Sequence, residues 1–203
     1  MKYININKLN FSKEQIRSII NYIKKGKVIF YPTDTIYGIG CLATNKKAIN
    51  KIYRIKKRDK SPLLVLVSSF AMLKKYSFIS EKQLKYLKKI WQKGKRPSSV
   101  ILKSKGNLPK ELTSGLDSIA VRLPSNLPKH DFLIKIIRGA GVPIVSTSLN
   151  ISGKEYIGMV DDLGIHFKED KPDLVVNAGN IKSRKPSKLI DLRDMEDIKV
   201  LRK

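Results

Sequence analysis

Small hydroxyl and carboxyl side chains gather in the stretch PTDTIYGIG, residues 32–40, directly after the apolar run VIFY. Thr33 and Thr35 supply hydroxyl groups, Asp34 supplies an acceptor, and the two glycines allow a ligand to approach the backbone closely. In α/β sheets, ligands bind where strands end and loops begin. This loop is therefore a candidate binding site, although the same residues are also typical of a plain turn.

Two cations separated by one residue, Lys56 and Arg58, stand in the stretch IKKRDKSPL, residues 55–63. In an extended segment, side chains two positions apart point to the same side. An arginine fork and a lysine point charge could then hold a polyphosphate together. The alternative is a solvated basic helix end, which the helix dipole also favours.

A second junction of this kind lies in PIVSTSLNISG, residues 143–153, where an apolar strand runs into hydroxyl and amide side chains. Its polar residues are Ser146, Thr147, Ser148 and Asn150. Such groups can form hydrogen bonds to phosphate or ribose without adding charge, but a turn rich in Asn and Ser is an equal alternative. Near the end of the chain, Ser187 precedes one predicted strand and Arg202 ends another, and each is a weak signal alone.

Helices and strands alternate along the chain, which is the pattern of an α/β fold. Apolar spacing and capping residues predict helices at 12–25, 46–56, 80–91 and 131–138. Strands are predicted at 28–31, 62–67, 99–102, 119–123, 143–148, 173–177, 187–192 and 198–202. Some of these strands have no helix between them, so we expect an open, twisted, mixed β-sheet with flanking helices. The length suits a single domain over residues 1–203.

The composition excludes several classes of protein. Cys41 is the only cysteine, which excludes a disulfide framework and a Cys-based zinc site within one chain. With only His130 and His166 available, we also expect no histidine metal cluster. No apolar run approaches the roughly 18 residues that span a bilayer, and the N-terminus lacks the apolar segment of a secretory signal. We therefore expect a cytoplasmic protein.

The charge of the chain is unusual, because 42 Lys and Arg residues stand against 17 Asp and Glu, for a net charge of +25. Such a balance favours nucleic acid, nucleotides or other phosphates as partners, with tRNA or double-stranded RNA on a basic face as one case. The alternative is a coding bias, because the lysines are spread along the whole chain instead of one arm.

The motifs taken together resemble one family. PTDTIYGIG, the K-x-R before PL, VRLP at 121–124, S-x-N-x-S-G and the late PS, IDL and LR occur in the order and spacing of the YrdC-type threonylcarbamoyl-AMP synthases, from about residue 12 to residue 203. The resemblance implies a YrdC-like fold with a basic concave face and an ATP-dependent nucleotidyltransferase. Such an enzyme joins L-threonine and bicarbonate or CO2 to AMP, releases pyrophosphate, and uses Mg²⁺ with its ATP. Its product passes to a transferase complex for threonylcarbamoyladenosine modification of tRNA next to the anticodon.

The resemblance also implies roles for individual residues. Those matched to L-threonine binding are Thr35, Arg122 and Ser187. Those matched to catalysis are Lys56, Arg58, Ser148 and Asn150. The same four would bind ATP together with Ser61, Ser146 and Arg202. The chain departs from the family pattern in the loop between Arg58 and Pro62, which is one residue short, and this weakens the match at Ser61.

Two alternatives belong to other classes of function. A non-catalytic module that binds double-stranded RNA or tRNA would account for the charge, but the chain has no RRM-type aromatic signature. A carbamoyl-adenylate-forming module of hydrogenase maturation is similar, but those proteins are far longer and carry Cys-rich zinc segments. Pyrophosphate release that depends on threonine separates the synthase from the RNA-binding module.

Overall fold

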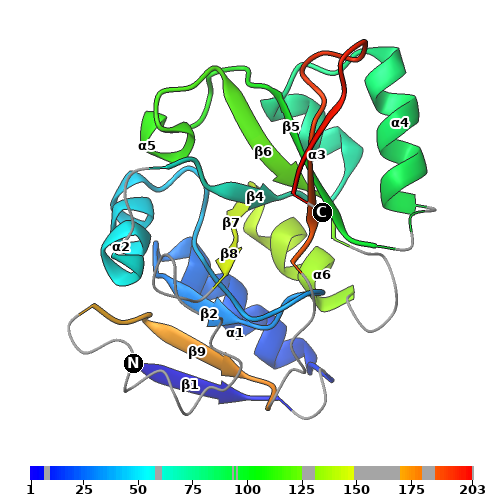
Figure 1. The fold of residues 1–203 in the computed structure, drawn as a ribbon. Coiled ribbons are helices and arrows are strands. Elements are labelled where there is room, and N and C mark those ends of the chain that lie inside the picture. Colours follow the sequence, from blue (N-terminus) through cyan, green and yellow to red (C-terminus); the bar gives the residue numbers. More distant parts are fainter. Residues whose placement is uncertain are drawn as a thin grey trace.

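The computed structural model describes residues 1–6, 10–57, 61–92, 94, 96–124, 131–148, 170–179 and 186–202. Two of the predicted site residues, Arg58 and Asn150, lie outside this part of the chain, as do His130 and His166. The described residues form two β-sheets with helices around them (Figure 1).

The two sheets each mix parallel and antiparallel strands. The first has five strands, in the order β1 (Lys2–Asn5), β9 (Leu174–Asn177), β2 (Ile29–Tyr31), β3 (Gly38–Gly40) and β8 (Thr147–Ser148). The second has six, in the order β11 (Lys199–Arg202), β10 (Lys188–Asp191), β5 (Ser98–Lys103), β6 (Ser118–Arg122), β4 (Leu64–Leu66) and β7 (Ile144–Val145). The predicted mixed α/β class is confirmed, and its strands divide between two sheets where the sequence suggested one.

The longer helices begin where their capping residues predict. These helices are α1 (Lys13–Lys24), α2 (Lys46–Lys56), α4 (Glu81–Gln92) and α6 (Asp131–Ala140). Ser12 and Gln15 form the predicted capping box of α1, and Asn45 caps α2 by accepting a hydrogen bond from the Ala48 amide. The short helices α3 (Phe70–Tyr76) and α5 (Lys110–Thr113) were not predicted. None of the helices in the described ranges has the length and apolar character needed to cross a bilayer.

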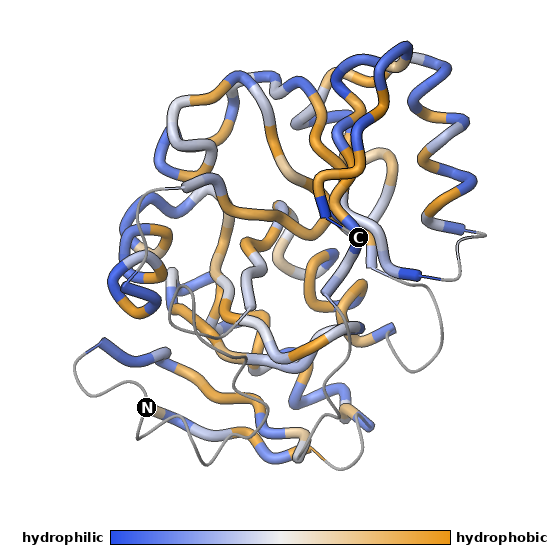
Figure 2. Tube along the Cα trace, in the orientation of Figure 1, coloured by the Kyte–Doolittle hydropathy of each residue, from blue (hydrophilic) through white to orange (hydrophobic). Residues whose placement is uncertain are grey.

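Strand β2 is buried on both faces, which explains its unbroken apolar sequence. Ile29 belongs to a core cluster that includes residues of α1 and α6, whereas Phe30 packs into a second cluster that includes residues of α2. Figure 2 shows apolar residues along the central strands and an alternation of polar and apolar residues along α4. The loop after β2 therefore starts from a strand that both core clusters hold in place.

The predicted strand at 143–148 is two short strands that belong to different sheets. β7 pairs with β4 in the six-stranded sheet, and β8 pairs with β3 in the five-stranded sheet. Ser146 stands between them, and its amide donates a hydrogen bond to the Leu64 carbonyl at 2.9 Å. The chain thus crosses from one sheet to the other at Ser146, and the two sheets meet there.

Asp173, just before β9, joins this strand to α2 and to the start of β2. Its carboxylate accepts hydrogen bonds from the Val28 amide at 2.8 Å and from Lys51 Nζ at 2.9 Å. Burial alone would raise the pKa of Asp173, but the contacts with Lys51 and Val28 outweigh it and hold the pKa below its usual value of 3.8.

We expect Asp173→Asn to lower the free energy of unfolding by about 1–2 kcal/mol near neutral pH, because two hydrogen bonds to a carboxylate are weakened. A carboxyl group whose pKa is lowered by folding stabilises the folded state above its unfolded pKa and loses that effect as the pH falls through the folded pKa. Urea denaturation should therefore give a difference between variant and wild type that shrinks below about pH 4. A difference that is constant down to acid pH would contradict the ionic contribution.

Candidate active site

A cavity of about 230 Å³ lies where the two sheets meet. Among the described residues, those lining it from the first sheet and its loops are Thr33, Thr35, Ile36, Tyr37, Gly38, Thr147 and Ser148. Those lining it from the second sheet and adjoining segments are Pro62, Leu64, Ala120, Arg122, Ser146, Pro186, Ser187, Leu189 and Arg202. Six residues that the sequence predicted for a site are therefore brought together: Thr35, Arg122, Ser146, Ser148, Ser187 and Arg202.

The loop after β2 is both a turn and a wall of the cavity. The Thr33 hydroxyl donates to the Ile36 carbonyl at 2.6 Å and accepts from the Thr35 amide at 3.1 Å. The two threonine hydroxyls lie 3.0 Å apart. Because Thr33 has already donated its one proton to Ile36, Thr35 is the donor between the two hydroxyls. Thr35 Oγ1 keeps its capacity to accept, and Arg122 Nη1 donates to it at 3.4 Å.

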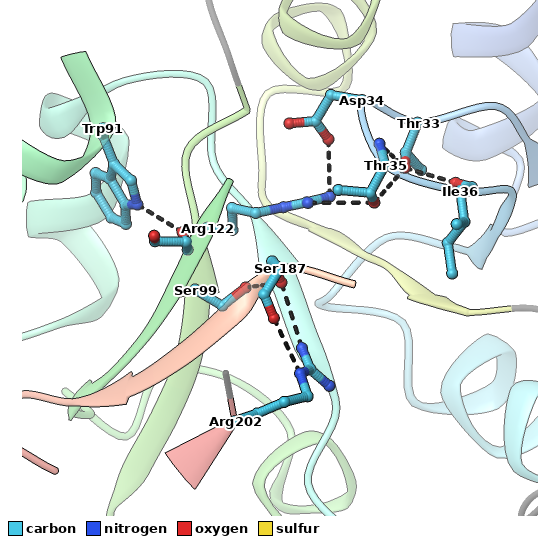
Figure 3. A network of polar contacts seen from close by, with 10 residues as sticks. Thr33, Asp34, Thr35, Ile36, Trp91, Ser99, Arg122, Ser187 and Arg202 are labelled. Atoms are coloured by element: carbon cyan, nitrogen blue, oxygen red, sulfur yellow. Dashed lines mark hydrogen bonds and ion pairs between the residues drawn. The ribbon is translucent and has the colours of Figure 1, made fainter. Parts of the chain in front are cut away.

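Asp34 and Arg122 form a buried ion pair beside the cavity. Arg122 Nη2 lies 3.0 Å from Asp34 Oδ1, and the two side chains are 4% and 1% exposed. Figure 3 shows the Arg122 side chain stretched towards the turn, with Asp34 and Thr35 near its end. Among the described residues, Arg122 Nε has no hydrogen-bond partner. The acceptor that the sequence predicted at Asp34 is thus engaged with a cation of the same site.

A second polar group of the cavity is built around Ser187, just before β10. Its hydroxyl lies 2.8 Å from the hydroxyl of Ser99, a completely buried residue of β5. Arg202, at the end of β11, donates from Nε to the Ser187 carbonyl at 2.9 Å and from Nη2 to its hydroxyl at 3.3 Å (Figure 3). Sequence reasoning missed Ser99, because a serine inside a strand carries no signal until its neighbours are known.

Lys56 lies behind the cavity wall and contacts it through Ser148. It is the last residue of α2, it is only 2% exposed, and its ammonium group donates a hydrogen bond to the Ser148 carbonyl. We expected the chain to leave this helix in an extended conformation. That prediction is wrong at the first residue, because Lys57 has a left-handed backbone conformation with φ 45°. The Lys56 side chain therefore points inward because of its position on the helix, and not because side chains alternate along an extended segment that includes Arg58.

Ser61 and the two glycines of the PTDTIYGIG stretch were also predicted to take part in the site, and they have different outcomes. Ser61 is not among the residues that line the cavity, although its neighbour Pro62 is, and its carbonyl accepts a hydrogen bond from the Tyr53 hydroxyl at 2.7 Å. Gly38 lines the cavity as expected. Gly40 instead serves packing, because a Cβ there would lie 2.2 Å from the Val145 carbonyl oxygen.

Tyr37 anchors the loop after β2 to the end of β9. Its hydroxyl donates to the Gly179 carbonyl and accepts from the Ala178 amide, both at 2.8 Å. Burial raises the pKa of Tyr37, so the hydroxyl stays protonated at neutral pH and can act as donor and acceptor at once. The segment from Thr33 to Gly38 is therefore fixed at both ends, and its hydroxyl groups have defined positions.

The donor chemistry of the site suits anionic ligands. It consists of hydroxyls, a buried guanidinium and a second arginine, and in the described ranges no group of three or more His, Cys, Asp or Glu side chains could hold a metal ion. Arginine forks bind carboxylates and phosphates in a bidentate way, and hydroxyls complete such contacts. The cavity can therefore take a molecule that carries both kinds of group.

Comparisons with known proteins agree with the resemblance seen in the motifs. The Sua5/YciO/YrdC family model, described as "Telomere recombination", matches residues 21–203. A Methanocaldococcus jannaschii protein, named provisionally as a threonylcarbamoyl-AMP synthase, is 33% identical over 98% of this chain and 91% of its own. The threonylcarbamoyl-AMP synthase of Haemophilus influenzae is 31% identical over 86% of this chain and 93% of its own.

A solved structure supports the same relationship. Pyrococcus abyssi Sua5 complexed with L-threonine superposes with a TM-score of 0.81 at 28% identity, covering 94% of this chain. The chain spans 54% of that longer protein. The match of the family model over most of the chain confirms the predicted relationship. The chain belongs to the Sua5/YciO/YrdC family.

Proposed function

We propose that this protein is a threonylcarbamoyl-AMP synthase, which forms L-threonylcarbamoyladenylate and pyrophosphate from L-threonine, bicarbonate or CO2, and ATP. One observation carries the proposal: distant segments bring a guanidinium, several hydroxyls and a second arginine to a single cavity. The names of the relatives from M. jannaschii and H. influenzae support it. The proposal treats the chain as one catalytic domain, since both sheets line the cavity.

L-threonine would bind at the side of the cavity that holds Arg122, Thr35 and Ser187. The guanidinium can receive the carboxylate of the amino acid, and the hydroxyls of Thr35 and Ser187 can meet its polar groups. Leu64, Ala120 and Leu189 add apolar surface to the lining, which suits the methyl group of threonine. The Pyrococcus relative was solved with L-threonine, which supports this choice of amino acid.

ATP would bind beside the amino acid, with Ser146, Ser148 and Arg202 as its polar groups and Lys56 supporting Ser148. Arg202 contacts Ser187, so the two proposed parts of the site adjoin there. Arg58, Asn150 and Ser61 complete the proposed nucleotide site, although Arg58 and Asn150 lie outside the described residues. Mg²⁺ usually binds through substrate phosphates and water instead of a cage of protein ligands. Hydroxyl-rich walls fit an ion that enters with ATP, and such an ion would offset charge on the phosphates.

The chemistry proposed for the site needs no side-chain nucleophile. The neutral threonine amine adds to CO2 and loses a proton to solvent to form an N-carboxylate, which attacks the α-phosphorus of ATP and displaces pyrophosphate. Nucleotidyl transfer of this kind is accelerated mainly by positioning and by neutralisation of charge. Arg122 and Thr35 would hold the amino acid, and Lys56, Ser148 and Arg202 would hold the nucleotide, so that the two reacting atoms meet within the cavity.

The deciding experiment measures pyrophosphate release from ATP by the purified protein. We expect release only when both L-threonine and bicarbonate are present, and much less with L-serine. Release that is independent of the amino acid, or none at all with folded protein, would contradict the proposal.

We expect Arg122→Ala to raise the KM for L-threonine at least tenfold and to change the KM for ATP less than threefold. The reason is that a charge-assisted pair with a carboxylate is worth about 1.5–3 kcal/mol, and the nucleotide contacts stay in place. Initial rates over both substrate concentrations give the two constants. Equal increases in both would contradict a specific contact with the amino acid.

The wider context of the reaction is also part of the proposal. The product would pass to a threonylcarbamoyl-transferase complex that modifies tRNA, and the protein would act in the cytoplasm, where one buried thiol and no disulfide are ordinary. The net charge of +25 supports contact with tRNA. A purely non-catalytic RNA-binding module is not favoured, because the relatives are named as synthases.

A further inference from the structure

Arg122 carries the positive charge of the proposed amino-acid site on a long side chain that rises from β6. An arginine side chain has many rotamers, and ordering it costs about 2 kcal/mol of conformational entropy. A guanidinium that must receive a small carboxylate therefore needs an anchor inside the protein. Such an anchor lies in the loop between β2 and β3, which belong to the other sheet.

The anchor is the carboxylate of Asp34, at 3.0 Å from Arg122 Nη2. Asp34 is held in a turn that the Thr33 hydroxyl fixes through the Ile36 carbonyl and the Thr35 amide. The Asp34 side chain is 1% exposed, and Asp34 is not among the residues that line the cavity. Arg122, which does line the cavity, is its described link to a substrate.

Stability alone explains this pair poorly. Taking two charges out of water costs several kcal/mol per ion, and buried ion pairs often stabilise a fold no better than apolar residues of the same volume. In addition, Arg122 Nε is buried without a hydrogen-bond partner in the described part of the chain. Such a donor adds to the cost of holding the guanidinium in this orientation, so stability does not account for the pair.

We propose that Asp34 is a positioning residue, which orients the Arg122 guanidinium so that it receives the carboxylate of the amino-acid substrate. This inference rests on the proposed function, because it takes Arg122 as the carboxylate-binding group. The role belongs to the position of the Asp34 oxygen, 3.0 Å from Nη2, more than to its negative charge. Removing the charge alone would strengthen the attraction between Arg122 and a carboxylate, whereas losing the orientation weakens binding.

The test compares Asp34→Ala, which removes the acceptor, with Asp34→Asn, which keeps one acceptor oxygen but no charge. We expect Asp34→Ala to raise the KM and the Kd for L-threonine at least tenfold with a change below threefold in the KM for ATP. Asp34→Asn should stay within threefold of wild type. Pyrophosphate release gives the KM values, and calorimetry with L-threonine alone gives the Kd without any turnover.

A matched control is Asp173→Asn, which removes another ion-paired carboxylate that does not line the cavity. It should leave the KM for L-threonine within twofold of wild type. A double variant adds a second check, because Asp34→Ala should change the KM less than twofold when Arg122 is already Gln. The double variant also buries no unpaired charge, so it remains informative if Asp34→Ala does not fold.

Three results would overturn the inference. They are an unchanged or lower KM for L-threonine in folded Asp34→Ala, equal increases in the KM values of both substrates, and a further large increase from Asp34→Ala in the Arg122→Gln background. Failure of the proposed function looks different, because wild-type protein would then show neither threonine binding nor threonine-dependent pyrophosphate release.

Discussion

Replacing Lys56 with alanine is expected to lower kcat/KM for threonine-dependent pyrophosphate release by about 30- to 1000-fold. The factor corresponds to about 2–4 kcal/mol, the usual loss when a preorganised group that faces developing charge is removed. Lys56 is 2% exposed, and its ammonium group contacts Ser148, a residue of the cavity wall. A charge held in such a dry place acts more strongly on a nearby phosphate than a charge in water does.

Two further variants separate catalysis from folding. Lys56→Met keeps most of the buried stem and removes only the charge, so it should lose activity as Lys56→Ala does while keeping more of the thermal stability. Lys47→Ala, at an exposed lysine on the same helix, should stay within twofold of wild-type activity. Wild-type turnover by folded Lys56→Met would show that the charge at this position has no catalytic role.

Replacing Gly40 with alanine is expected to lower the free energy of unfolding by about 3 kcal/mol, at the upper end of the usual cost of overpacking a core. The new Cβ would lie 2.2 Å from the Val145 carbonyl oxygen and 3.0 Å from Tyr31 Cε1. The first of these atoms belongs to the backbone of β7, which cannot move without disturbing its pairing with β4. Urea denaturation followed by circular dichroism measures the loss.

Gly139→Ala is the matched control for this prediction. A Cβ at Gly139 would lie 2.3 Å from Ile20 Cδ1, but that atom is the end of a flexible side chain and can turn away. Gly139 also lies within α6, where alanine is favoured over glycine by about 1 kcal/mol. We expect a cost well below that of Gly40→Ala, and equal losses in the two variants would contradict the backbone clash.

Local rules predict the helices of this protein well and its sheets less well. Ser12 and Asn45 mark helix starts, because a cap is a contact between residues three apart and depends on nothing distant. β3 was missed because its sequence, GIG, has the composition of a turn. It is a strand because it pairs with β2 and β8, and Gly40 allows the close approach of Val145, a residue about a hundred positions away. The division into two sheets follows from pairings of the same long range.

The sequence predicted several of the residues that meet at the cavity but not how they are connected. Thr35, Arg122 and Ser187 were found through motifs, and all three line one space. The contacts that hold them were not predicted, because Asp34 meets Arg122, and Ser99 meets Ser187, across about ninety positions of the chain. The inward direction of the Lys56 side chain likewise depends on where α2 ends. A helix one residue longer or shorter would change that direction.

The segment from Ile144 to Ser148 joins the two sheets, because its first strand pairs in one sheet and its second strand pairs in the other within five residues. Inserting or deleting one residue between β7 and β8 would shift one of these strands relative to the other and turn its side chains to the opposite face. The positions of the proposed nucleotide contacts Ser146 and Ser148 therefore depend on how both sheets pair along this segment, so a change in either sheet would alter the nucleotide site.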